Sequence, residues 1–154
     1  MPEGGKGRNE AVKIIRITTD NEISVHDFPE ETYGWEQNRQ LRRLIGKQCD
    51  TYEHVMPRRL YTELGASRKN GMEPGDCTSM LVDEEGILRG LETNTVGSYL
   101  YEADKHGNVI AGNILIVGKK WAGDGIEFCG MSENQFSLLY PRLEELVRKA
   151  RKMG

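Results

Sequence analysis

Alternating apolar positions near the start of the chain predict a β-hairpin. From Val12 to Phe28 the apolar residues recur with a period of two on either side of Asp20-Asn21, a pair that suits a tight turn. Pro29 then ends the second strand, because proline has no amide proton to donate to a sheet. Residues 1–10 show no apolar periodicity and are predicted to be a flexible tail, which leaves residues 11–154 as a single domain.

The most apolar short run of the chain, from Ile114 to Val117, predicts a buried strand at the centre of the fold. Another strand is predicted over 78–82. In the region 52–64, Pro57 leaves two alternatives: a short strand that ends before it, or an edge strand that bends there. The glycine-rich stretch 118–130 is predicted to be a flexible loop.

Apolar residues at helical spacing predict three helices. The first lies within 35–48 and ends at Gly46, and the second begins near 93–95. Ser132 and the residues after it match a capping box ahead of a long amphipathic C-terminal helix, in which Pro141 predicts a kink or a restart. This order of elements predicts an α+β fold with a mainly antiparallel sheet of about four or five strands and two or three helices.

Composition favours a soluble, cytoplasmic protein. The sequence shows neither a signal peptide nor an apolar run near the ~18 residues that a membrane helix needs. Its three cysteines form no C-x-x-C motif and are expected to be small buried residues in a reducing compartment. A net charge of -3 gives no general case for nucleic acid as a partner. Homodimerisation through an open sheet edge is left undecided.

The sequence contains no recognisable catalytic, metal or cofactor motif. Its three histidines, His26, His54 and His106, lack zinc-site spacing and are interpreted as surface or packing residues. The glycine clusters do not match a phosphate-binding loop. We therefore expect no cofactor and no metal site.

Two groups of residues could contact a partner. Lys119, Lys120 and Trp121 lie together in the predicted loop, where an exposed tryptophan beside lysines could stack a base or anchor a protein. Burial of Trp121 against the sheet is the favoured alternative, because large aromatic residues are mostly buried. The second group comprises basic residues of the first helix and of the segment after it, which could form one patch: Arg39, Arg42, Arg43, Lys47, Arg58 and Arg59. A solvated helix surface is the favoured alternative for them.

Four strings, VKIIRI, MLVDEEGILRGLETN, SYLYE and IAGNILIVG, resemble segments of the uncharacterised family known as domain of unknown function 3846. The resemblance covers roughly two thirds of the chain. It implies an accessory protein of phages, plasmids or conjugative elements, and it implies no established reaction. The positions that recur in that family would correspond here to Asp83, Gly86, Gly90, Asn94, Tyr99 and Gly112. Asn94 is the polar position that turn geometry alone does not explain, although a helix N-cap role would suffice.

The preferred hypothesis is a non-enzymatic accessory binding protein of phage or mobile-element type, which occupies a host protein or another macromolecule, or a small nucleotide-like ligand. Its candidate contact residues are Asn94, Tyr99, Lys119, Lys120, Trp121, Arg42, Arg43 and Arg58. One alternative is a small hydrolase or transferase with a dispersed site such as His54, Cys77 and Asp124. The other, which we favour less, is a nucleic-acid-binding protein; it requires the arginines of the first helix and Arg58-Arg59 to share one face.

Overall fold

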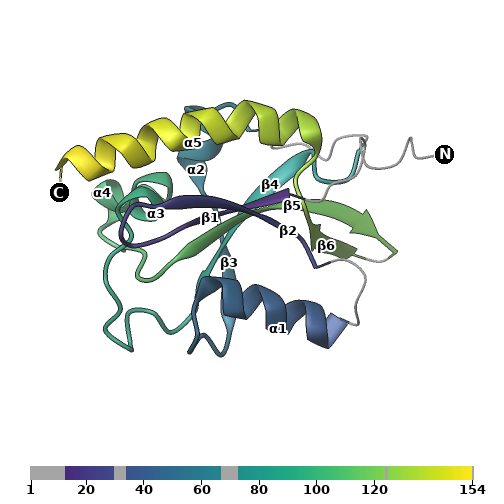
Figure 1. The fold of residues 1–154 in the computed structure, drawn as a ribbon, viewed down its shortest axis with the longest axis horizontal. Helices are drawn as coiled ribbons and strands as arrows, with labels where there is room; N and C mark the ends of the chain where they lie inside the picture. The colour runs from purple at the N-terminus through teal and green to yellow at the C-terminus, as the bar shows by residue number, and fades with distance from the viewer. Residues whose placement is uncertain (1–12, 30–33, 67–72, 124, 154) are drawn as a thin grey trace.

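An antiparallel sheet forms the centre of the protein, with helices on both faces (Figure 1). The computed structural model describes residues 13–29, 34–66, 73–123 and 125–153. The strands are β1 (Lys13–Ile17), β2 (Ile23–Asp27), β3 (Tyr52–Val55), β4 (Cys77–Asp83), β5 (Ile114–Ala122) and β6 (Gly125–Cys129). The helices are α1 (Gly34–Ile45), α2 (Arg58–Thr62), α3 (Thr95–Leu100), α4 (Ala103–His106) and α5 (Glu133–Met153).

Strand β5 organises the sheet, whose order is β2-β1-β5-β4-β3. One edge of β5 pairs with β4 from Ile114 to Lys119. On the opposite edge, β1 pairs with the first residues of β5 and β6 pairs with the last ones. The end of β5 therefore continues past β4 and forms a hairpin with β6.

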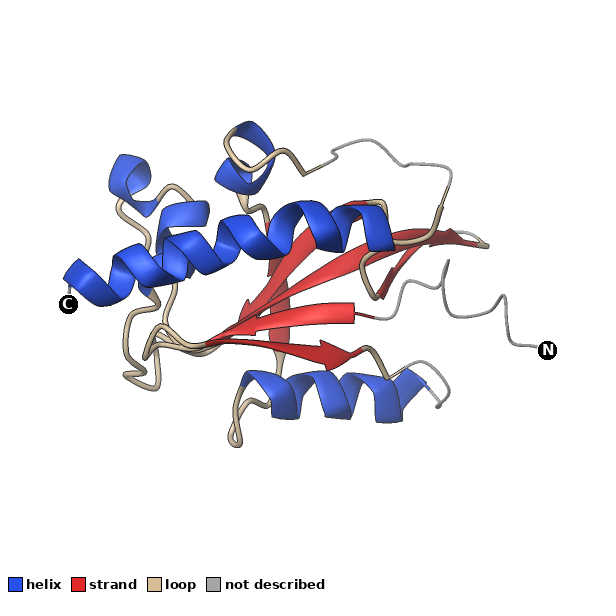
Figure 2. Cartoon of the chain, turned by 45° about the horizontal axis from the view of Figure 1, so that its top comes forward, coloured by secondary structure: helices blue, strands red, loops and turns tan. Residues whose placement is uncertain are grey.

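The alternation of side chains along the central strands produces two cores, one on each face of the sheet. Met80 and Ile116 point to the larger core, which α5 covers together with α2 and α3. Leu81 and Leu115 point to the smaller core, which α1 covers with Leu41 and neighbouring residues. Figure 2 shows α5 and α1 on opposite sides of the sheet.

The α+β class, the antiparallel sheet and the long C-terminal helix predicted from the sequence are confirmed. The described residues contain six strands and five helices, more of each than predicted. The first hairpin and the strand before Pro57 are present. Pro57 then precedes the short helix α2 as its N-cap residue, which the sequence did not predict.

The predicted flexible loop over 118–130 is wrong, because most of this stretch forms the β5–β6 hairpin. The predicted tail at 1–10 lies outside the described residues. Two helix caps are as predicted: the Asn94 side chain accepts from the amide of Gly97, and the Ser132 hydroxyl accepts from the amide of Gln135. Helix α5 runs through Pro141 without restarting. Among the described residues, no helix is long and apolar enough to cross a membrane.

Candidate functional site

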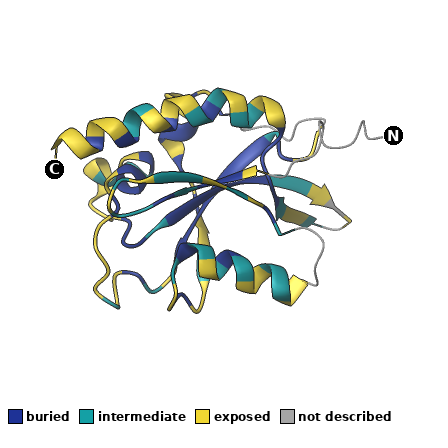
Figure 3. Ribbon diagram, in the orientation of Figure 1, coloured by how far each residue is buried: buried dark blue, intermediate teal, exposed yellow. Residues whose placement is uncertain are grey.

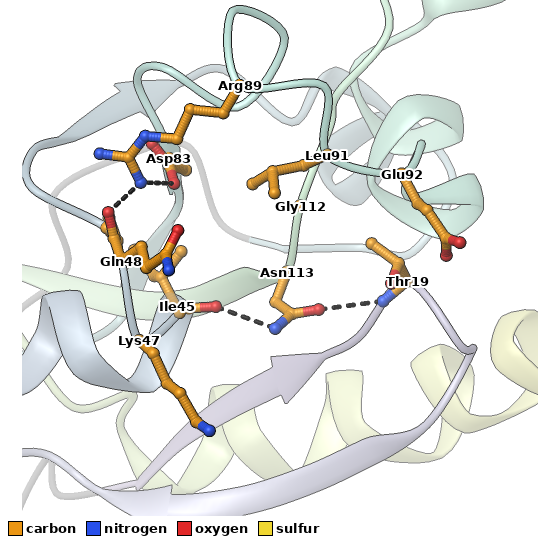
Figure 4. A pocket seen from close by; sticks show the side chains of 12 residues that line it. Thr19, Ile45, Lys47, Gln48, Asp83, Arg89, Leu91, Glu92, Gly112 and Asn113 are labelled. Carbon is orange, nitrogen blue, oxygen red and sulfur yellow. Dashed lines mark hydrogen bonds and ion pairs between the residues drawn. The ribbon is translucent and has the colours of Figure 1, made fainter.

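A pocket of about 410 Å³ opens at one end of the sheet, beside the C-terminus of α1 (Figure 4). Its lining comes from four separate parts of the chain. These are Thr19 of the β1–β2 turn, residues 45–49 from the last residue of α1 onward, Asp83 at the end of β4 with Arg89, Leu91 and Glu92 after it, and Gly112-Asn113 before β5. The volume falls in the range of ligand pockets in proteins, which is roughly 300–1,000 Å³. These four segments meet only in the folded chain.

The Asn113 side chain fixes two of the pocket's walls relative to one another. Its Nδ2 donates to the Ile45 carbonyl oxygen at 2.9 Å, and its Oδ1 accepts from the Thr19 amide at 3.0 Å. The amide of Asn113 thus ties the C-terminus of α1 to the turn of the first hairpin. A wall held in this way is preorganised before any ligand arrives.

Arg89 joins the loop after β4 to the segment after α1. Its guanidinium donates to the carbonyl oxygen of Gln48, to Asp50 Oδ2 at 2.9 Å and to Glu85 Oε1 at 3.2 Å. Asp83 Oδ2 lies 3.7 Å from Nη1. Three carboxylates therefore surround this guanidinium, which leaves it little capacity to bind an anionic ligand.

Backbone geometry beside the pocket depends on two glycines. Gly112 adopts φ +97°, which favours glycine, and a Cβ there would come within 3.0 Å of Leu91 Cδ1. A Cβ on Gly86 would lie 2.3 Å from the Ala111 carbonyl oxygen, so the loop after β4 can pack here only without a side chain. These contacts bring Leu91 over Gly112 at the pocket.

The charged groups that line the pocket are equal in number and opposite in sign. Lys47 and Arg89 balance Asp83 and Glu92 among the lining residues. Burial, followed by the charge of Asp83, raises the pKa of the Cys49 thiol to about 11. The thiol is therefore protonated at neutral pH, when a nucleophilic cysteine would need to be a thiolate.

Asn94 and Tyr99 have structural partners. Asn94 is fully buried; its Nδ2 donates to the carbonyl oxygens of Ile17 at 3.1 Å and Gly112 at 3.0 Å. It supports the pocket from behind without reaching it. Tyr99 donates to Glu63, and its ring carries the guanidinium of Arg59 at 4.4 Å from the ring centroid.

The predicted basic patch is not assembled. Arg42 and Arg43 lie on α1, whereas Arg58 and Arg59 lie on α2, which covers the opposite face of the sheet. Arg59 is buried and donates to Asp104 at 2.6 Å and 2.9 Å, and this interaction lowers the pKa of Asp104 to about 2. The shared face that the nucleic-acid hypothesis required is therefore absent.

Lys119, Lys120 and Trp121 belong to strand β5 and not to a loop. Successive side chains of a strand point to opposite faces, so Lys119 and Trp121 share one face and Lys120 lies on the other. Trp121 is 62% exposed, and the favoured prediction of its burial was therefore wrong.

The dispersed hydrolase site finds no support in the described geometry. Cys77 is buried at the start of β4, the His54 ring lies against Phe128, and Asp124 lies outside the described residues. His26 Nε2 lies 2.8 Å from the Ser24 hydroxyl, but this pair is on edge strand β2 and does not line the pocket. No group of three metal-ligating side chains occurs within the part of the chain that the structure describes.

Sequence reasoning missed Asn113, Arg89 and Leu91 as pocket residues. A usable signal was present for Gly112, which the family resemblance marked as recurrent. No local pattern marks Asn113, because its role depends on contacts with Ile45 and Thr19, which are 68 and 94 residues away along the chain. Comparison of the chain with protein-family models, curated proteins and solved structures finds no match.

Proposed function

We propose that this protein is a non-enzymatic binding protein whose pocket takes a small molecule of nucleoside size. The observation that carries the proposal is the preorganised pocket of about 410 Å³, with Leu91 and Ile45 as apolar contacts and several polar groups around them. A small number of fixed polar groups around apolar walls is typical of small-molecule sites. The protonated thiol of Cys49 supports binding in preference to covalent chemistry.

Charge narrows the class of ligand. Arg89 is occupied by three carboxylates, which leaves Lys47 as the remaining cation among the lining residues. A phosphate would gain no free guanidinium here and would meet nearby carboxylates. Within the nucleotide-like class predicted from the sequence, these charges favour a nucleoside or another neutral molecule.

Several positions implied by the family resemblance lie in the pocket or beside it. Asp83 and Gly112 line the pocket, Gly86 shapes the loop beside it, and Asn94 binds the carbonyl oxygen of Gly112. A role as an accessory protein of a mobile element rests on that resemblance alone. The pocket supports the binding function independently of it.

Native mass spectrometry of protein purified gently from its cells tests the proposal, followed by titration with nucleosides and their 5′-phosphates. Leu91→Trp should weaken binding at least tenfold, because the Leu91 side chain points into the pocket (Figure 4) and an indole would fill that space. Val109→Trp is the matched control, since Val109 is 40% exposed, Leu91 is 41% exposed, and Val109 does not line the pocket.

Binding that survives Leu91→Trp would contradict the pocket assignment, and so would an empty protein that no compound of this size binds. Tighter binding of the phosphates than of the nucleosides would contradict the charge argument and leave the pocket in place.

A host protein is the second candidate partner. Ile87 is 65% exposed and Leu88 is 86% exposed, on the loop whose residues Arg89 and Leu91 line the pocket. Adjacent exposed apolar side chains on one loop give a protein partner apolar surface to bury. The proposal predicts capture of a host protein that Leu88→Ser abolishes, and capture unaffected by this substitution would contradict it.

A further inference from the structure

The β5–β6 hairpin carries a second surface, away from the pocket. Strand β4 pairs with β5 only as far as Lys119, so the residues beyond it extend past β4. Figure 3 shows intermediate and exposed residues along this hairpin, whereas the central strands are mostly buried. Trp121 and Ile126, which pair across the hairpin, are 62% and 49% exposed.

Strand alternation assigns the side chains of this surface to the face that α1 covers. Leu115 and Val117 belong to the core beneath α1, so Lys119 and Trp121 follow on the same face. Phe128 pairs with Lys119, and His54 pairs with Leu81 of the same core. We call the resulting surface the aromatic face; its members are Arg42, Tyr52, His54, Lys119, Trp121 and Phe128.

Three rings of the aromatic face, those of Tyr52, His54 and Phe128, lie close together although β4 and β5 separate β3 from β6. The ring centroids of His54 and Phe128 are 5.7 Å apart, and those of Tyr52 and Phe128 are 6.5 Å apart, both edge to face. Ser79, which lies on the same face of β4, is fully buried. Partial burial and the charge of Lys119 lower the pKa of His54, so its ring is neutral at pH 7.

Positive charge flanks these rings on both sides. Lys119 lies beside Phe128, and Arg42 donates through Nε to Asn38 Oδ1 at 2.8 Å, next to Tyr52. Glu53 and Glu127 of β3 and β6 alternate to the opposite face. Asp83 of β4 pairs with Tyr52 on the same face, but it is buried and lies 3.7 Å from Arg89 Nη1. The aromatic face is thus locally basic although the whole chain carries a net charge of -3.

We propose that the aromatic face binds single-stranded nucleic acid, with bases stacked on Trp121 and His54 and phosphates held by Lys119 and Arg42. Aromatic rings between cations are the arrangement that single strands require, because each base has an open ring face and each nucleotide carries a phosphate. A duplex fits this surface less well, since its bases already stack on one another. The proposal does not depend on the pocket or its ligand.

The chain supplies its own optical probe for the test. It contains two tryptophans, so Trp35→Phe leaves Trp121 as the single fluorescent indole. Titration of this full-length variant with a 12-nucleotide oligothymidine or oligouridine at low salt should quench the fluorescence, because bases stack on the indole. The affinity should fall linearly with salt on logarithmic axes, as phosphate contacts require.

Two substitutions separate stacking from general charge. Trp121→Ala should weaken binding at least about fivefold, measured by anisotropy of a labelled oligonucleotide. Lys119→Ala should weaken binding and reduce the salt slope by about 0.7, the contribution of one single-strand phosphate contact. Lys120→Ala is the matched control, because Lys120 is the next residue of the same strand and points to the opposite face.

Three outcomes would overturn the proposal. The first is that added oligonucleotide does not quench the Trp121 fluorescence at any concentration, even at low salt. The second is equal loss for Lys119→Ala and Lys120→Ala, which would reduce the interaction to unspecific charge. The third is capture of a protein from cell extract that Trp121→Ala abolishes while oligonucleotides fail to bind, which would assign the aromatic face to a protein partner.

Discussion

Asn94 connects three parts of the chain through one buried side-chain amide. Its Oδ1 begins helix α3 by accepting from the Gly97 amide at 2.8 Å, while its Nδ2 donates to the end of β1 at Ile17 and to Gly112 beside the pocket. A buried donor or acceptor that loses its partner costs about 1–3 kcal/mol, and loss of a helix cap costs about 1 kcal/mol. A single side chain therefore stabilises both the fold and the back of the pocket.

Asn94→Ala is expected to lower the free energy of unfolding by about 2–4 kcal/mol, because it removes the cap and leaves two carbonyl oxygens without this donor. Urea unfolding followed by circular dichroism measures the change. Asn108→Ala is the control: Asn108 is exposed, and its replacement should change the free energy by less than about 0.5 kcal/mol. If both substitutions change the free energy of unfolding equally, the hydrogen bonds of the buried Asn94 amide do not stabilise the fold.

Local patterns predicted those elements whose formation depends on neighbours in sequence. The alternation from Lys13 to Asp27 was sufficient for the first hairpin, and Ser132 marked the start of α5. Strand β6 was missed because its glycines suggested a loop, and its pairing with the end of β5 is what makes it a strand. Helix α2 was missed because Pro57 was interpreted as an interruption, although proline also suits the start of a helix.

The site escaped prediction for a similar reason. The pocket exists where four distant segments meet, and the periodicity of each segment describes only its own strand or helix. The exposure of Trp121 on the aromatic face could not be predicted from local sequence either. Its hydrophobicity predicted burial, but the strand on which it lies extends beyond β4, and the described residues leave its indole largely exposed.

At Gly118 the β5–β6 hairpin packs directly against neighbouring backbone. A Cβ at this position would lie 2.4 Å from the Gly130 carbonyl oxygen and 2.8 Å from Gly75 Cα. Gly118→Ala is therefore expected to destabilise the protein by about 1–3 kcal/mol, because neither backbone can yield without moving its strand or loop. Thermal unfolding at fixed pH measures the effect.

Gly125→Ala in the same hairpin is the matched control, since a Cβ there meets no atom within 4 Å. It should leave stability within about 0.5 kcal/mol of the original protein. If both alanine variants unfold alike, the close approach at Gly118 is relieved by movements that the fold tolerates.

At the scale of the whole molecule, one sheet separates two hydrophobic cores, one on each of its faces. In β4, Met80 and Val82 belong to the core under α5, whereas Leu81 between them belongs to the core under α1. Strand β5 alternates in the same way. Because the same two strands support both cores, loss of one core must disturb the backbone on which the other is built, and we expect the molecule to unfold as one cooperative unit.

Leu41→Ala in the α1 core and Leu143→Ala in the α5 core test this expectation. Both leucines are buried, and each replacement should lower the free energy of unfolding by about 2–5 kcal/mol. In both variants, tryptophan fluorescence, to which Trp35 of α1 contributes, and far-ultraviolet circular dichroism, to which α5 contributes most among the helices, should report the same midpoint. If Leu41→Ala instead separates the two transitions, α1 unfolds on its own, and the wall that residues 45–49 give to the pocket would then be a locally unstable element.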